Sequence, residues 1–506
     1  MRILLINPPH PAVASRCHRG RMPPLGLLAV GGPLIDDGHT VRLIDAEIKP
    51  LSFWEIVDEA RIWKPDAIYI GHAGSTSAHP SIARIAVCLK STLRHVPIIY
   101  GGVYPSYHAE EILAAHPEID IIVRGEGEET GRRLANVLAD GETLSSLFGI
   151  SYREEGRIIS TPAAETIRCL DEYRVGWELI EDWDQYQYWG VGRAAVVQFS
   201  RGCPHQCTYC GQRGFWTKWR HRDPQLIAAE IGWLYRERGV RFIDLADENP
   251  TTSRQLWREF LEALIAQNVS VQIVSTIRAG DIVRDADILH LYKQAGFARI
   301  LMGIETTSAE TQEKIRKGTT TAVDREAIRL LRKHDILSQV AHIVGFEQET
   351  DLDLLRGLRM LLDYDPDQVN AMYVTPHRWT PFYRESLDRQ VVEIDRSRWD
   401  YRHQVLGTKI PAWRVFLWVK MIEVILQLRP KALWRVLTHR DRAIRKSLRW
   451  CYNVGRRAWL FEVREYLFFH SSRVRGVSVA NFWGSPQDHE EQALVPLQPL
   501  REKSSV

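Results

Sequence analysis

The organisation of this chain can be read outward from Ser200-Arg201-Gly202-Cys203-Pro204-His205-Gln206-Cys207-Thr208-Tyr209-Cys210. Three of the seven cysteines lie in this stretch, with three and then two residues between them. Thiolates are the soft ligands that iron–sulfur clusters and zinc select, and three of them this close together can bind one face of a cube-shaped cluster. A fourth iron would then lack a protein ligand, and an open position is typical of a catalytic metal centre. The spacing therefore predicts a metal site at Cys203, Cys207 and Cys210.

The residues before the cysteines place this site on a loop that follows a strand. Residues 194–200 are apolar and β-branched, which predicts a buried strand. Loops at the carboxyl ends of parallel strands carry the chemistry of α/β proteins. A zinc site with His205 as fourth ligand is the alternative, although no second Cys/His pair follows at zinc-finger distance.

The pattern Cys-x3-Cys-x2-Cys, with Tyr209 directly before the last cysteine, resembles the signature of the radical S-adenosylmethionine (SAM) enzymes. The resemblance implies that the three thiolates hold a 4Fe-4S cluster and that SAM chelates the open iron. It further implies that a 5′-deoxyadenosyl radical, formed by reductive cleavage of SAM, abstracts hydrogen from an unactivated carbon.

Length and composition limit the remaining possibilities. A chain of 506 residues predicts about three domains, and 45% hydrophobic residues suffice for ordinary cores. A net charge of +3 predicts no attraction of the whole protein to nucleic acid. An odd number of cysteines, three of them clustered, argues against a disulfide framework and for a reducing cytoplasm. Residues 1–7 lack the pattern of a signal peptide and predict a first strand.

Residues 1–145 alternate short apolar runs with helical patterns, which predicts an α/β domain with a doubly wound parallel sheet of about five strands. Ligands of such sheets bind at the carboxyl ends of the strands. Those ends carry Asn7, Pro8, Pro9, Ser75, Thr76, Gly101, Gly102, Tyr104, Gly125, Glu126, Gly127 and Glu128. Glycine lets the backbone approach a large flat ligand, although glycine after a strand is also ordinary turn chemistry.

Taken with the cysteine motif, this first unit resembles the flavodoxin-like cobalamin-binding domain of cobalamin-dependent radical SAM enzymes. The resemblance rests on Asn-Pro-Pro at residues 7–9, Gly-Gly-x-x-Pro at 101–105 and Arg-Gly-Glu-Gly-Glu-Glu at 124–129. It implies that cobalamin binds at these strand ends. The chain lacks the Asp-x-His-x-x-Gly motif with which some cobalamin proteins supply a histidine to cobalt, so neither His10 nor His18 is expected to bind cobalt.

A second domain is expected at residues 194–385. Residues 146–193 predict a hairpin and an aromatic linker that packs between the domains. The strand-then-helix rhythm that follows predicts strands at 195–200, 241–246, 271–276, 298–303, 338–345 and 368–374. Helices are expected near 224–238, 253–267, 285–295, 308–333 and 351–363. Six such units predict a partial (βα)6 barrel, as the radical SAM resemblance also implies, with its site at the strand ends.

Polar residues at the ends of these strands are candidates for binding SAM. Asp247 and Glu248 follow the second strand, and a carboxylate there can accept hydrogen bonds from the SAM ammonium group. By resemblance, Arg278 would face the SAM carboxylate, and Glu305, close to Gly303, the ribose hydroxyls. The alternatives are that Arg278 caps a helix or pairs with Asp281 or Asp285, and that Glu305 caps the helix that begins near Ser308.

The last region, 386–506, loses the strand-and-helix rhythm and is expected to be mostly helical. Residues 409–464 are rich in Lys and Arg and contain as acidic residues only Glu423, Asp441 and Glu462. Apolar residues recur near helical spacing, and interrupting charges rule against a spanning helix. A basic amphipathic helix can lie on an anionic membrane or meet an anionic substrate, so peripheral contact at the inner membrane face is expected. A solvated basic face is the alternative.

Further motifs resemble, within the family, the anaerobic oxidative cyclases that act on a magnesium tetrapyrrole in bacteriochlorophyll synthesis. They include Leu245-Ala246-Asp247-Glu248, Ile343-Val344-Gly345 and Thr375-Pro376 followed by Thr380-Pro381. The resemblance implies ring closure with water as oxygen source, a flavodoxin- or ferredoxin-type electron donor and no nucleic acid partner. Residues 16–21 and 375–379 depart from the pattern. A methyltransferase with the same domains, or a paralogue with another substrate, therefore stays open, as does a non-enzymatic zinc- or nucleic-acid-binding protein.

Overall fold

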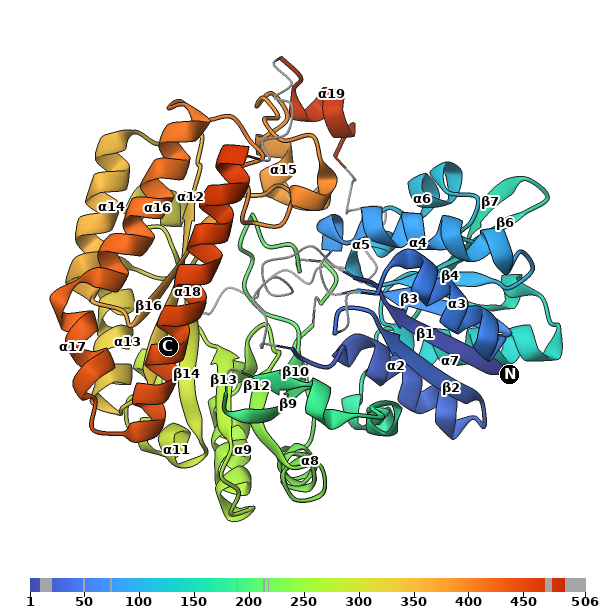
Figure 1. The fold of residues 1–506 in the computed structure, drawn as a ribbon, viewed down its shortest axis with the longest axis horizontal. Helices are drawn as coiled ribbons and strands as arrows, with labels where there is room; N and C mark the ends of the chain where they lie inside the picture. The colour runs from blue at the N-terminus through green and yellow to red at the C-terminus, as the bar shows by residue number, and fades with distance from the viewer. Residues whose placement is uncertain are drawn as a thin grey trace, which may run out of the picture.

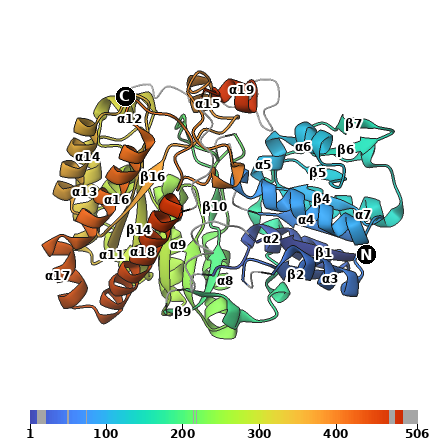
Figure 2. The same ribbon diagram turned by 45° about the horizontal axis from the view of Figure 1, so that its top comes forward.

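The structure, a computed structural model, describes residues 1–9, 21–48, 51–72, 75–188, 190–212, 214–216, 218–468 and 476–486. Two large sheets, one near each end of the molecule in Figure 1, are joined through a linker. The C-terminal helices α16 to α18 lie against the second sheet, in the half of the molecule away from the first sheet (Figures 1 and 2). His10 and His18 lie outside the described residues.

The first sheet has the strand order β2-β1-β3-β4-β5-β6-β7. The first five strands in the chain are parallel, which confirms the predicted doubly wound sheet, and their order is that of flavodoxin. The predicted hairpin does not stand apart: β6 and β7 extend this sheet as antiparallel strands beside β5. The strands are β1 (Arg2–Asn7), β2 (Thr40–Asp45), β3 (Ala67–Gly71), β4 (Ile98–Gly101), β5 (Ile121–Val123), β6 (Ile150–Glu154) and β7 (Arg157–Ser160).

Helices lie on both faces of this sheet, so residues 3–6 of β1 are fully buried. Burial on both faces is the reason that these residues form a continuous apolar run instead of alternating with polar residues. Ser52 and Glu55 form a capping box at the start of α3, where serine satisfies a free backbone N–H. The helices are α2 (Leu25–Asp36), α3 (Phe53–Trp63), α4 (His79–Thr92), α5 (Val103–Tyr107), α6 (Ala109–Ala115) and α7 (Gly127–Asp140).

The second sheet has the order β16-β15-β14-β13-β12-β9-β8, and all its strands except β8 are parallel. Six parallel strands in chain order confirm the predicted partial barrel and bring their carboxyl ends to one edge. The strands are β8 (Gln187–Tyr188), β9 (Gly192–Val197), β12 (Val240–Leu245), β13 (Gln272–Thr276), β14 (Phe297–Glu305), β15 (Leu337–Val344) and β16 (Gln368–Tyr373).

The helices of the barrel follow the prediction except in two places. The segment expected as one helix over 308–333 is broken, because Arg316 and Gly318 have positive φ angles of 53° and 65°. The segment expected at 285–295 begins earlier and is also divided. The helices are α8 (Pro224–Glu237), α9 (Arg254–Ala266), α10 (Ala279–Arg284), α11 (Leu289–Gln294), α12 (Ala309–Lys314), α13 (Thr321–Lys333) and α14 (Asp351–Tyr364).

The aromatic linker packs between the two sheets. Trp177 is buried and its indole N–H donates to Glu230 of α8 at 2.7 Å. Tyr186 is also buried and donates from its hydroxyl to Asp45 at the end of β2, at 2.9 Å. The linker therefore ties an element of the barrel and a strand of the first sheet to the same short segment.

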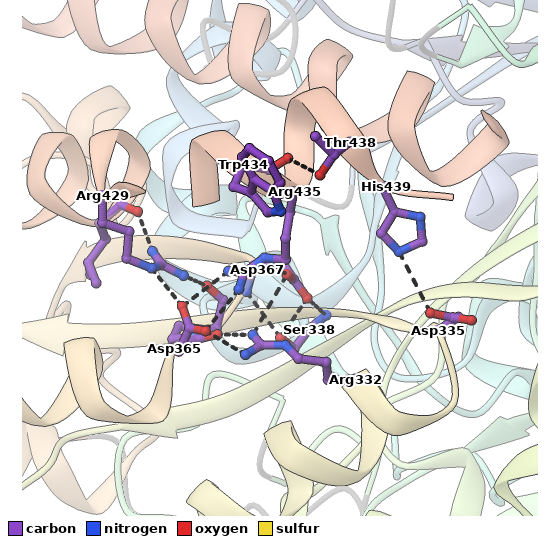
Figure 3. A network of polar contacts seen from close by, with 12 residues as sticks. Arg332, Asp335, Ser338, Asp365, Asp367, Arg429, Trp434, Arg435, Thr438 and His439 are labelled. Carbon is purple, nitrogen blue, oxygen red and sulfur yellow. Dashed lines mark hydrogen bonds and ion pairs between the residues drawn. The ribbon is translucent and has the colours of Figure 1, made fainter. Parts of the chain in front are cut away.

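Three helices, α16 (Ala412–Leu428), the shorter α17 (Pro430–Thr438) and α18 (Arg442–Phe468), follow a short α15 (Pro381–Glu385), and α19 (Val479–Trp483) comes last. Arg332, Arg429 and Arg435 converge on Asp365, which joins α17 to the loop before β16 (Figure 3). Burial opposes ionisation of Asp365, but the three guanidinium groups hold its pKa well below the usual range. In the described ranges, no helix is both long and apolar enough to cross a bilayer.

Candidate functional site

The cysteine loop leaves the second sheet at the end of β9 and lies on the side of the barrel that faces the first sheet (Figure 1). Its base is closed by two short antiparallel strands, β10 (Ser200–Arg201) and β11 (Arg220–His221). Gly202 has φ +92°, and a Cβ atom there would lie 2.4 Å from the carbonyl oxygen of Lys218. Glycine is therefore required for the two sides of the loop to meet.

The three cysteines of this loop suit an iron–sulfur cluster. All three are free thiols, and burial raises the pKa of the Cys203 thiol, so binding of a metal must displace its proton. Within the described ranges, no three His, Cys, Asp or Glu side chains lie close enough to share one metal ion. A 4Fe-4S cluster takes each thiolate on a different iron, so three thiols on one loop are a donor set that such a cluster can use.

Two acidic residues at the end of β12 hold the start of the cysteine loop. Asp247 accepts hydrogen bonds from the backbone N–H groups of Phe199 and Ser200 and from the Ser200 hydroxyl. Glu248 accepts from the backbone N–H of Gly202 at 3.2 Å. Burial raises the pKa of Asp247 to about 7 and that of Glu248 to about 6. Asp247, predicted to contact the cofactor, is thus engaged with the protein backbone, and Glu248 lies beside the first cysteine.

Arg278 lies within electrostatic reach of the cysteine loop. Its positive charge lowers the pKa of the Cys203 thiol, against the larger effect of burial. The guanidinium donates to the carbonyl oxygens of Lys317 and Gly318, in the break between α12 and α13. The alternative partners, Asp281 and Asp285, are instead paired with Arg284.

Glu305 is held at the end of β14 by a residue that the sequence did not single out. The Lys317 ammonium lies 2.7 Å from Glu305 Oε1, and both side chains are 9% exposed. Gly303 makes room for this pair, since a Cβ atom there would lie 2.1 Å from the same oxygen. Burial, and then Glu305, raise the pKa of Tyr209. The signal in the sequence that could have pointed to Lys317 is the adjacent Gly318, because a glycine inside a helical pattern can mark a break in the helix.

At the first sheet, some predicted cofactor contacts are engaged within the protein. Asn7 is buried and donates to Asp45 at 2.8 Å, and Pro8 and Pro9 follow it directly. Tyr104 is buried and its ring stacks on His108, with centroids 4.4 Å apart. Gly127 serves helix packing, because a Cβ atom there would lie 3.1 Å from a methyl group of Val30 on α2. The side chain of Ser75 lies outside the described residues.

Two glycines at the same strand ends leave open space. Gly125 has φ +84°, and a Cβ atom built there meets nothing within 4 Å. Gly102 has φ +117°, and its Cβ atom would meet only the carbonyl oxygen of His72, at 3.8 Å. Gly101 lies directly before it at the end of β4. A backbone cradle of this kind fits the close approach of a large flat ligand such as cobalamin.

Glu126 and Glu128 join the two domains. Arg201, two residues before Cys203, pairs with Glu126 at 3.0 Å and with Glu128, and its guanidinium lies over the Trp216 ring. Glu126 also pairs with Arg220 at 2.8 Å. Both carboxylates, predicted to contact the cofactor, are thus neutralised by cations at the base of the cysteine loop.

A second connection between the domains runs through His377, which the sequence showed only as a departure from the expected pattern. This buried side chain lies 3.4 Å from the Thr76 hydroxyl in η1 (Ser75–Ser77) and 2.6 Å from the Tyr401 hydroxyl. A Cβ atom on Gly211, which follows the last cysteine, would lie 3.0 Å from His377 Nε2. Burial lowers the pKa of His377 to about 4, so the ring is neutral at pH 7.

Comparison with known proteins agrees with this arrangement. A family model described as the Radical SAM superfamily matches residues 197–361, and one described as the B12 binding domain matches residues 12–135. An anaerobic magnesium-protoporphyrin IX monomethyl ester cyclase of Synechocystis sp. is 52% identical over 98% of this chain and 99% of that protein. A protein of the same name from Cereibacter sphaeroides is 34% identical over 81% of this chain and 67% of its own.

Solved structures show the same fold at lower identity. The cobalamin-dependent SAM radical enzyme OxsB, with aqua-cobalamin and SAM bound, has a TM-score of 0.69 at 18% identity, covering 95% of this chain and 77% of its own. The radical SAM methyltransferase TsrM from Kitasatospora setae has a TM-score of 0.68 at 15% identity, covering 92% and 99%. At these identities the likeness is one of fold.

Proposed function

This chain belongs to the anaerobic magnesium-protoporphyrin IX monomethyl ester cyclases, and we propose that the cysteine loop and the strand ends around it carry out that reaction. The chain is a radical SAM oxidoreductase whose cofactors are a 4Fe-4S cluster, SAM and cobalamin. Its reaction closes the isocyclic ring of magnesium-protoporphyrin IX monomethyl ester by oxidation, with water as the oxygen source. The observation that carries the assignment is the 52% identity along 98% of the chain.

Cys203, Cys207 and Cys210 hold the cluster in this proposal. When bound, the three cofactors supply an electron, a radical that removes hydrogen from an unactivated carbon, and a second redox-active centre. The task of the protein is then to fix the loop and to exclude molecular oxygen and stray hydrogen donors. Asp247 fixes the loop through the backbone of residues 199 and 200, and Gly202 lets the two sides of the loop close.

Glu248, Arg278 and Glu305 are proposed to hold SAM. Glu248 accepts from the backbone beside Cys203, and the charge of Arg278 acts on that thiol, so both groups lie near the cluster ligands. In this arrangement Glu248 accepts from the SAM ammonium group, Arg278 faces its carboxylate and Glu305 its ribose. Lys317 orients Glu305, and Gly303 and Tyr209 complete the surroundings of that carboxylate.

The glycine cradle is proposed to receive cobalamin. The support is the open space at Gly102 and Gly125, at the ends of β4 and β5. Thr76, in η1 after β3, lies 3.4 Å from His377, so its side chain connects the strand ends of the first sheet with the loop that follows β16. Glu126 and Glu128 then act by holding the loop rather than by touching the cofactor.

Anaerobic incubation of the reconstituted chain with SAM, cobalamin, a reductant and the magnesium porphyrin ester tests the function. Mass analysis should show a tetrapyrrole that has gained one oxygen and lost four hydrogens, and heavy-oxygen water should label the product. The Cys207→Ala chain should give neither product nor SAM cleavage. A product that has instead gained a CH2 unit would identify a methyltransferase and refute the cyclase assignment.

Two partners complete the proposal. A flavodoxin- or ferredoxin-type protein supplies the reducing electron, because the described chain offers one candidate iron–sulfur loop and needs an outside source of electrons. The helices within 409–464 contact a membrane peripherally, supported by the excess of Lys and Arg over Asp and Glu in this stretch. The proposed reaction involves no nucleic acid partner.

A further inference from the structure

Exposed apolar side chains gather on three C-terminal helices. In the described part of the chain, eleven of the nineteen exposed large apolar side chains lie on α16, α17 and α18. These helices are neighbours: α16 and α18 meet through the stacked rings of Phe416 and Tyr466, 4.0 Å apart, and through Lys420 and Glu462. Figures 1 and 2 show them together in the half of the molecule away from the first sheet, with α18 across the front of the barrel in Figure 1. Exposed large apolar side chains gathered on neighbouring helices in this way are typical of an interaction site.

The helix α16 is apolar on two opposite faces. Its buried face packs toward β16 through Val415, Val419, Ile422 and Leu426. Its opposite face is equally apolar and is exposed, with Trp413 at 51%, Leu417 at 47% and Leu428 at 57%. A helix with two apolar faces normally buries both, whereas in the described part of the chain the outer face of α16 is exposed.

The helix α17 is fixed with its apolar residues outward. Arg435 turns inward to Asp365, as Figure 3 shows, and Ala432 and Val436 are buried. This anchoring leaves Trp434 68% exposed and Leu437 62% exposed. Arg429, at the start of this short helix, and Arg435, near its end, both pair with Asp365 and fix the rotation of the helix about its axis. Trp434 therefore points outward because of the orientation of the helix, whichever rotamer its side chain adopts.

The helix α18 alternates cations and apolar residues along its outer stripe. Arg456 and Arg457 are followed one turn later by Leu460 and Phe461, then by Arg464, and then by Leu467 and Phe468. All of these side chains are exposed. Long cationic side chains can keep their stems on an apolar surface while the charge reaches polar head groups.

The charges of this surface are predominantly positive. Glu423 and Glu462, which could have balanced them, are buried and paired with Lys420 and Arg402. Trp, Leu and Phe mixed with Arg on exposed helices is the composition of interfacial helices, in which aromatic rings sit at the level of the head groups. An acidic protein partner would meet the cations but would not require so many exposed aliphatic side chains.

We propose that the outer face of α16, α17 and α18 docks on an anionic lipid bilayer, with Trp434 and Leu437 entering the interfacial layer and Arg456, Arg457 and Arg464 meeting lipid phosphates. The proposal rests on the proposed function in one respect, since a large, mostly apolar porphyrin ester would be taken from or returned to that layer. The bilayer is the occupant, and the helices lie on it without crossing it.

Flotation of the full reconstituted chain with vesicles tests this surface without any substrate. Vesicles of phosphatidylcholine with one third phosphatidylglycerol should carry the wild-type chain, and pure phosphatidylcholine should carry far less. The double variant Trp434→Gln, Leu437→Gln should bind the anionic vesicles at least about ten-fold more weakly. The triple change of Arg456, Arg457 and Arg464 to Gln should cost about two orders of magnitude at low salt.

A matched control is available on the first domain. Trp54 and Ile62 on α3 are 61% and 73% exposed, and changing both to Gln should leave vesicle binding unaltered. Absence of wild-type binding, or equal loss in this control, would overturn the proposal. So would a wild-type dimer that the Trp434 and Leu437 changes convert to monomer while vesicle binding persists. SAM cleavage should be retained in all three variants, so failure of docking is distinguishable from failure of the cyclase assignment.

Discussion

Replacing Arg201 by methionine should show how strongly the cysteine loop is fastened to the first domain. The Arg201 side chain is 13% exposed, and those of its partners Glu126 and Glu128 are 7% exposed. Methionine keeps the unbranched stem of arginine and removes only the guanidinium. Glu126 keeps Arg220 at 2.8 Å, so the carboxylate left without its ion pair is that of Glu128. Removing one partner of a buried ion pair costs about 3–5 kcal/mol, and we expect a loss in this range at neutral pH.

The loss should depend on pH with a definite sign. Burial disfavours the ionised form of Glu128, but Arg201 outweighs it and holds the pKa below the ordinary value. The pair therefore stabilises the wild-type fold above the pKa of unfolded glutamate, about 4.3, and this contribution is lost as the pH falls through the lower folded pKa. In the variant, burial is opposed only by the smaller effects of a backbone hydrogen bond and the charge of Arg220, so the pKa of Glu128 is higher than in the wild-type chain. The difference between the two chains should be largest at neutral pH and shrink on acidification.

Urea unfolding followed by circular dichroism, at neutral pH and near pH 5, measures this difference. A second change, Glu128→Gln, should restore most of the stability to the Arg201→Met chain, because no buried charge is then left unpaired. Arg42→Met is the matched control: its pair with Glu59 is at 3.1 Å but about one third exposed, and the expected loss is at most about 1 kcal/mol. An Arg201→Met loss no larger than that of Arg42→Met, or no rescue by Glu128→Gln, would refute the reasoning.

Three further predictions concern the cofactors. Cys207→Ala should abolish reductive SAM cleavage and the brown colour of the cluster, whereas the same change at exposed Cys169 should leave both intact. Gly102→Val should lower the cobalamin retained after gel filtration; Gly141→Val, which carries similar backbone strain at φ +67° away from the strand ends, should not. Lys317→Met should weaken SAM binding in calorimetry by more than about ten-fold, because a buried carboxylate loses its partner. Unchanged SAM cleavage in Cys207→Ala, unchanged cobalamin content in Gly102→Val, or unchanged SAM affinity in Lys317→Met would contradict the corresponding prediction.

Much of the fold could be predicted from local patterns. The alternation of apolar runs with helical spacing predicted the doubly wound sheet of the first domain and placed the parallel strands of the second sheet within a few residues of their positions. A strand buried on both faces needs a continuous apolar run. The hairpin at 150–160 was also visible, but not the sheet it joins. The turn of the hairpin is encoded by neighbouring residues. Its pairing with β5 depends on the free edge of that strand, which exists only once the first domain has folded.

The candidate site divides in the same way. The sequence by itself determined the three cysteines, the glycines and the acidic residues at the strand ends, since metal ligation and close backbone approach require particular residue types at short spacing. Only the tertiary structure decided which of these residues are engaged within the protein. Glu128 meets Arg201 across 73 residues of chain, and Lys317 reaches Glu305 because the helix breaks at Arg316. A buried charge needs a partner of opposite charge, and tertiary packing decides which residue lies close enough to pair with it. The spacing of residues in the sequence does not predict that pairing.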